Sequence, residues 1–197
     1  MKLYPLNTNP YQITPLGIAQ HEVAHAVMAK ICRFPATRLT ATGVGGCREG
    51  NGTRIQPDEA VLIVLAGVAW EAMEGLGPPL ELIDFETTDA CFSDITRAWK
   101  MSEESLALRA MPRFNRLGEL KYSIATIQES IRYWISRATT QLKPYRALIA
   151  RVGAILHQRH ELSARQVAQL LRRVRPGILP DEDLRVPRRV RKATKVM

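Results

Sequence analysis

The sequence predicts a mainly helical domain that carries one small β-hairpin or sheet. Most of its 197 residues fall into segments with helical patterns of apolar residues. One stretch, residues 34–56, differs because Thr, Val and Arg alternate there around five glycines, as in short strands joined by turns. A hydrophobic content of 46% at this length is enough for one domain with a substantial core.

The first elements follow in order along the chain. Residues 1–13 predict an extended, proline-containing arm. Thr14 and Pro15 predict a helix start, because a hydroxyl N-cap is followed by proline at the first helical position. The helix itself is expected over residues 18–31, and its apolar neighbours predict that it is buried. Strands near 37–42 and 53–56 would form the hairpin.

The rest of the chain predicts further helices. A strongly apolar one is expected over residues 59–74, closed by Gly75. Ser163 is a plausible N-cap for the last short helix, which Pro176 and Gly177 stop. The remaining helical segments are 94–110, 117–142, 145–160 and 164–174. We therefore expect one domain over residues 14–175 and a tail over residues 176–197.

His21-Glu22-Val23-Ala24-His25 forms an H-E-x-x-H motif inside the first predicted helix. Residues four apart lie on the same helix face, so two imidazoles there can hold one metal ion, and zinc suits them best. Glu22 adjoins the first ligand, where a carboxylate can take a proton from water at the metal and prepare it to attack a carbonyl. The motif predicts zinc-dependent peptide hydrolysis. The alternative is an ordinary pair of core or surface histidines.

A catalytic zinc takes three protein ligands and leaves one position for water, so a third ligand is needed. The other two histidines, His157 and His160, belong to a late helix, and we expect them at the surface. Carboxylates are the stronger candidates, and those in and after the apolar helix are Glu71, Asp84, Glu86, Asp89 and Asp94.

Cysteine usage and hydropathy predict a cytoplasmic protein with no membrane partner. Cys32, Cys47 and Cys91 are odd in number and too far apart for C-x-x-C motifs, which favours a reducing compartment. The N-terminus lacks the apolar stretch of a secretory signal. The longest apolar run, residues 60–70, is too short to span a bilayer.

The net charge of +9 is concentrated at the C-terminus. Six basic residues fall in the last 13 positions, and without them the net charge falls to +3: Arg185, Arg188, Arg189, Arg191, Lys192 and Lys195. Such a tail can attract nucleic acid or an acidic partner by charge alone. A solvated, disordered terminus is the alternative.

Four stretches, taken in order, resemble the proteolytic domain of the FtsH-type zinc peptidases, the membrane-bound AAA+ proteases. Residues 21–27 resemble that family's H-E-x-x-H-A-[VL] signature, and residues 65–71 resemble its L-A-G-R-x-A-E segment. Residues 88–98 resemble its small-residue turn and D-[IL]-x-x-A helix start, and residues 155–171 resemble its C-terminal segment. The order of the four is more specific than any single one.

The resemblance implies a zincin-like fold and assigns roles by position. The third zinc ligand would be Asp94, and Glu71 would orient a ligating histidine. The glycine-rich residues 43–52 would belong to a hairpin beside the cleft that binds an extended substrate strand by backbone hydrogen bonds. Two departures are Val68, where the family usually has arginine, and the bulkier Trp70.

The sequence has no Walker A motif and so predicts a peptidase that does not use ATP, standing alone or borrowing an unfoldase. Its substrates would be peptides or loosely folded proteins, and the oligomeric state, including a homo-oligomer, is left open. The competing hypothesis is a catalytically silent binding or regulatory protein of the same fold that uses the tail over residues 185–195 to reach nucleic acid. Retention of Glu22 beside both histidines favours the enzyme, because a purely structural site needs no base.

Overall fold

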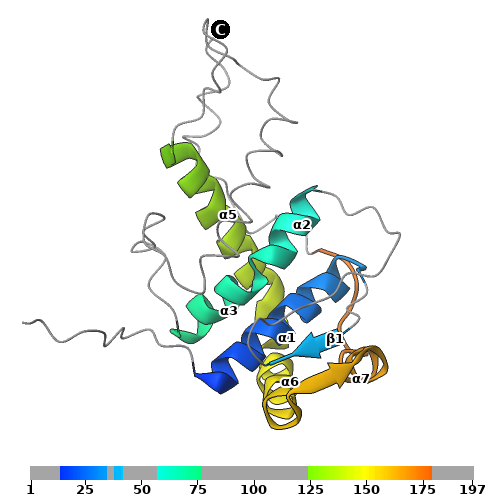
Figure 1. Ribbon diagram of the computed structural model, residues 1–197. Coiled ribbons are helices and arrows are strands. Elements are labelled where there is room, and N and C mark those ends of the chain that lie inside the picture. The colour runs from blue at the N-terminus through cyan, green and yellow to red at the C-terminus, as the bar shows by residue number, and fades with distance from the viewer. Residues whose placement is uncertain (1–13, 35–37, 42–56, 77–123, 179–197) are drawn as a thin grey trace, which may run out of the picture.

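The computed structural model describes residues 14–34, 38–41, 57–76 and 124–178. Within these ranges the fold is mainly helical with a two-stranded antiparallel sheet, which confirms the predicted fold class at this level (Figure 1). Its elements are α1 (Pro15–Ile31), β1 (Arg38–Thr40), α2 (Pro57–Val64), α3 (Ala66–Glu74), α5 (Ile124–Leu142), the 3₁₀ turn η2 (Lys143–Tyr145), α6 (Arg146–Arg159), β2 (Glu161–Ser163) and α7 (Ala164–Leu170).

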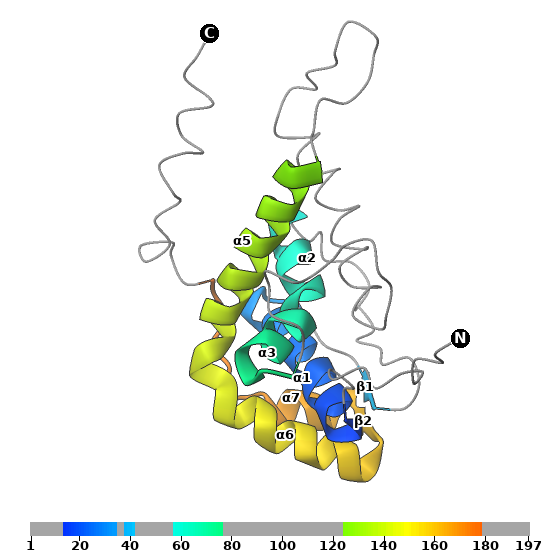
Figure 2. The same cartoon turned by 90° about the vertical axis from the view of Figure 1, so that its left-hand side faces the viewer.

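Helix α1 is the centre of the described fold. It begins as predicted: the Thr14 hydroxyl accepts a hydrogen bond from the Gly17 N–H at 3.0 Å, and Pro15 takes the first helical position. The α2–α3 pair lies on one side of α1, and α6, α7 and the sheet lie on the other (Figures 1 and 2). Most α1 residues are consequently buried, as its apolar neighbours predict.

The predicted single helix over residues 59–74 is wrong, because the structure divides it into α2 and α3 at Leu65. Leu65 has φ −86° and ψ 0°, outside regular helical values. Two helices that continue in nearly the same direction keep the same apolar face, so periodicity alone does not reveal the break. Gly75 closes α3 in the left-handed conformation at φ 66°, as predicted.

The small sheet also corrects the sequence prediction. The first predicted strand is present as β1, but its partner in the described structure is β2, with Leu39 opposite Leu162. The predicted partner near residues 53–56 lies outside the described residues. Strands of three residues leave little periodicity to detect. Strand β2 directly follows His160, which ends α6 in a left-handed conformation with φ 61°. Leu39 and Leu162 are both fully buried.

The later helices agree closely with prediction. Helix α6 matches the expected 145–160 to within one residue at each end, and Ser163 caps α7 through a capping box with Gln166. Helix α7 is shorter than predicted, since it ends at Leu170 and continues as a turn. The expected helix over 94–110 and the first residues of the one over 117–142 lie outside the described residues.

The C-terminal end of the described chain returns to α1. The Gly177 N–H donates to the Ile31 carbonyl at 2.8 Å, and Ile178 packs against the core. The predicted tail thus contacts the rest of the described fold through Gly177 and Ile178, and its residues after Ile178, like the arm over residues 1–13, lie outside the described residues. None of the described helices is long and apolar enough to cross a lipid bilayer.

Candidate metal centre

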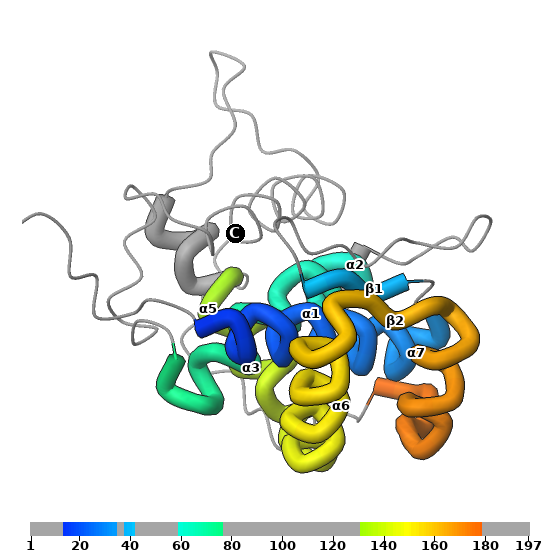
Figure 3. Tube along the Cα trace, turned by 60° about the horizontal axis from the view of Figure 1, so that its bottom comes forward, coloured from blue at the N-terminus to red at the C-terminus, as the bar shows by residue number. Residues whose placement is uncertain are grey.

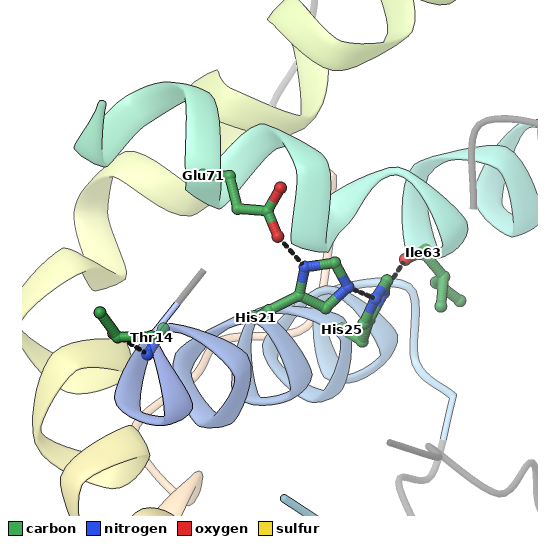
Figure 4. Close-up of polar contacts among 6 residues, drawn as sticks. Thr14, His21, His25, Ile63 and Glu71 are labelled. Carbon is green, nitrogen blue, oxygen red and sulfur yellow. Dashed lines mark hydrogen bonds and ion pairs between the residues drawn. The ribbon is translucent and has the colours of Figure 1, made fainter. Parts of the chain in front are cut away.

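The two histidines of the H-E-x-x-H motif face each other on α1. Their Nε2 atoms lie 2.9 Å apart, and the rings are 69° from parallel with centroids 4.7 Å apart (Figure 4). This follows from the spacing, because residues four apart stand one above the other on a helix. The side of α1 that carries the pair is covered by α2 and α3, so His25 is buried and His21 has a side chain that is 14% exposed.

The orientation of His25 is set by a backbone carbonyl. Its Nδ1 lies 2.7 Å from the Ile63 carbonyl oxygen. A carbonyl only accepts, so Nδ1 carries the proton and donates. Ile63 belongs to the last turn of α2, where carbonyls lack a partner within their own helix. The break at Leu65 therefore makes this carbonyl available to hold the imidazole.

The orientation of His21 is set by Glu71 of α3. One carboxylate oxygen of Glu71 lies 2.5 Å from His21 Nδ1. The Glu71 side chain is only 2% exposed, so its charge is largely removed from water, and a close hydrogen-bonded partner offsets that cost. The resemblance assigns Glu71 to orienting a ligating histidine, and this is the contact that such a role requires.

These two contacts decide which nitrogen each ring presents to the other. With Nδ1 donating to an oxygen, the neutral ring keeps its basic lone pair on Nε2. Both basic nitrogens then converge on one point, as in metal sites where histidine binds through one nitrogen and donates from the other.

The separation of the nitrogens can be compared with that in a zinc site. Two nitrogens bound to a tetrahedral zinc ion at 2.0–2.1 Å lie about 3.3 Å apart. The observed 2.9 Å needs to widen by only about 0.4 Å to match. The pair therefore fits zinc. A proton held between the two nitrogens would satisfy the same geometry without a metal, and the two cases differ in whether purified protein contains zinc.

Gly67 makes room for the His21 ring, and sequence reasoning assigned it no role. A Cβ on this residue would lie 2.5 Å from His21 Cδ2 and closer still to Nε2 and Cε1. The ring thus packs directly on the α3 backbone. A sequence signal exists: glycine in an apolar helix costs about 1 kcal/mol relative to alanine, so its presence there indicates a packing or functional reason.

The other residues predicted for the site are Glu22, two late histidines and four carboxylates. Glu22 is on α1 and is 8% exposed, so the predicted base is a buried carboxylate next to the pair. Among the described residues, no group of three His, Cys, Asp or Glu could hold a metal ion. His157 is half-buried and His160 exposed, in keeping with the surface position expected for them. The carboxylates Asp84, Glu86, Asp89 and Asp94 all lie outside the described residues.

Val68 and Trp70 depart from the family pattern, and both belong to the core. Val68 is 4% exposed and Trp70 is 1% exposed. Both side chains are part of the hydrophobic core of the described residues.

In comparisons with known proteins, no family model matches the chain and no curated protein matches its sequence. The FtsH-type resemblance stays a prediction that depends on the four motifs and their order.

Proposed function

We propose that the chain is a zinc-dependent endopeptidase with a zincin-like fold of the FtsH type. One observation carries the proposal: two histidine Nε2 atoms converge at 2.9 Å while Glu71 and the Ile63 carbonyl hold the opposite nitrogens. Buried histidines of any kind have hydrogen-bonded nitrogens, but here both Nδ1 atoms are occupied in a way that turns both basic Nε2 atoms toward one point. His21 and His25 would hold the zinc ion, and Asp94 is the proposed third ligand.

The chain's own residues have distinct tasks in this reaction. Bound zinc would supply a Lewis acid that polarises the scissile carbonyl and acidifies water. Glu22 would accept a proton from the attacking water and then give it to the leaving amine. Glu71 and the Ile63 carbonyl would keep both imidazoles in the tautomer that presents Nε2.

The substrates proposed are peptides and loosely folded proteins, cleaved without ATP. Folded domains keep their backbones in their own hydrogen bonds, and the sequence has no Walker A motif with which to drive unfolding. The cytoplasm is the proposed location, and Cys32 supports it as a buried free thiol of the kind that a reducing compartment preserves.

The decisive experiment replaces Glu22 with glutamine. Glutamine keeps the size of the side chain but does not take a proton, so Glu22→Gln is expected to retain bound zinc and lose nearly all hydrolysis of casein. Zinc is measured by elemental analysis after purification without added metal, and the fold by circular dichroism. Glu74→Gln is the matched control, since Glu74 is a carboxylate on α3 whose hydrogen-bonded partner is Arg146.

Three outcomes would overturn the proposal. If the wild-type protein takes up no zinc even when zinc is added, a proton shared between the two histidines explains their contact and the pair is not a metal site. If zinc-loaded protein cleaves no unstructured substrate, the zinc has a structural role and no catalytic one. Full activity in Glu22→Gln would remove the assigned base.

A further inference from the structure

A basic groove lies between α6 and the region around α7, away from the metal centre. It has a volume of about 470 Å³, and its lining includes four arginines, two glutamines and the apolar side chains Ile155 and Leu170. The arginines are Arg151 and Arg159 on α6 and Arg172 and Arg173 in the turn that follows α7. Figure 3 shows α6 and α7 side by side, joined through β2.

Unlike Arg38 and Arg146, the four arginines have no carboxylate partner among the described residues. Arg38 pairs with Glu161 at 2.7 Å and Arg146 pairs with Glu74 at 2.6 Å. None of the groove arginines forms an ion pair with any of the described residues. Residues 146–178 contain seven arginines and a single acidic residue. The groove is therefore a surface of concentrated positive charge that the described part of the chain does not neutralise.

The groove and the metal centre use different sides of the fold. Gly153 faces α1, because a Cβ there would lie 2.5 Å from Gln20 Cγ. Successive residues of a helix are rotated by about 100°, so Arg151 and Ile155, each two positions from Gly153, point to the opposite side of α6. A ligand in the groove leaves the histidine pair untouched.

The layout of the charges favours an extended polyanion over a single phosphate. Arg151 and Arg159 are eight residues apart, which places their Cα atoms about 12 Å apart along α6. All four arginines are exposed, whereas a compact phosphate site gathers its donors around one point. Guanidinium groups pair with phosphate oxygens through two parallel hydrogen bonds. Half-buried Ile155 and Leu170 add apolar surface between the charges, where sugars or bases can lie.

We propose that this groove binds the sugar-phosphate backbone of a nucleic-acid strand. Contacts to phosphates carry no base information, so binding is independent of sequence and strongly dependent on salt. The proposal does not rest on the metal centre, nor on the basic residues of the tail.

The test measures binding of the full chain to a fluorescein-labelled 15-nucleotide oligothymidine by anisotropy across a salt series. Two groove variants are compared, Arg151→Gln with Arg159→Gln, and Arg172→Gln with Arg173→Gln. Each is expected to bind about tenfold more weakly at low salt and to lower the slope of log K against log salt by about 1.4, the value for two phosphate contacts on a single strand.

The matched control is Arg165→Gln with Arg175→Gln, which likewise removes two exposed arginines that have no ion pair among the described residues, at positions outside the groove. It is expected to keep the wild-type slope, and all three variants are expected to keep the wild-type melting temperature, because exposed substitutions seldom change stability. Since every variant retains the basic tail, only a difference between groove and control variants reports on the groove.

Several results would overturn the proposal. If the groove and control variants lose the same amount of binding, the oligonucleotide is held by general charge attraction and not by the groove. Inorganic phosphate is then added at a concentration equal to that of the phosphate groups in the oligonucleotide. If it displaces the oligonucleotide, the groove is a site for a single phosphate. Equal binding of an oligoglutamate, lost in the same groove variants, would assign the groove to an acidic protein.

Discussion

Replacement of Gly67 by alanine gives the sharpest test of the metal centre. The added Cβ would lie 2.5 Å from His21 Cδ2 and nearer to two further ring atoms. Nonbonded carbon atoms prefer 3.5–4.0 Å, so the ring must withdraw by about 1 Å. Metal–ligand distances tolerate only about 0.2 Å. We therefore expect Gly67→Ala to lower zinc affinity by about 100-fold or more.

The assay is chemical denaturation with and without zinc. Zinc at 100 times the wild-type Kd stabilises the wild type by about 2.7 kcal/mol, and a variant with 100-fold weaker binding gains only about 0.4 kcal/mol at that concentration. Without zinc the variant combines a helix-propensity gain of up to about 1 kcal/mol with an overpacking cost of about 1–3 kcal/mol. The zinc-free measurement therefore separates folding from binding.

Gly153→Ala is the matched control, because Gly153 is another buried helical glycine packed on α1. Its Cβ would meet Gln20, next to His21, at 2.5 Å from Cγ and 3.0 Å from Cα. We expect this variant to lose stability yet keep the full stabilisation by zinc. If zinc stabilises Gly67→Ala by about 2.7 kcal/mol as well, the added Cβ does not displace the His21 ring from its metal-binding position. That result would refute this prediction even if the wild type binds zinc.

Three further predictions concern the site and the core. Glu71→Gln should weaken zinc binding about 10- to 100-fold, whereas Glu74→Gln should not, as measured by competition with a chromophoric chelator. Asp94→Ala should lower zinc affinity sharply and Asp89→Ala should leave it unchanged; the reverse result would move the third ligand to Asp89. Burial, with a smaller effect from the Glu59 carboxylate, raises the pKa of the Cys32 thiol from 9.0 to about 12. The unfolded chain then loses this proton first, so the free energy of unfolding should fall from about pH 9 to about pH 12, and more steeply than in Cys32→Ala. Peptide mapping should find the native Cys32 unmodified by iodoacetamide at pH 8.

Sequence alone determined the features that depend on neighbouring residues. The Thr14 cap, the face shared by His21 and His25, the extent of α6 and the start of α7 at Ser163 all follow from propensity, capping and helical spacing. Each involves residues within a few positions of one another, so the chain's local chemistry is enough to specify it.

Tertiary structure decided which distant groups meet these local features. Glu71 is 50 residues from His21, and Ile63 is 38 residues from His25. The family resemblance suggested the first of these partners, whereas no residue pattern pointed to the carbonyl, because every residue has one. Its availability depends on the break at Leu65, and the pairing of β1 with β2 joins Arg38 to Ser163 across most of the chain. Such contacts depend on how helices pack around α1, and packing is a property of the folded chain that periodicity along the sequence does not contain.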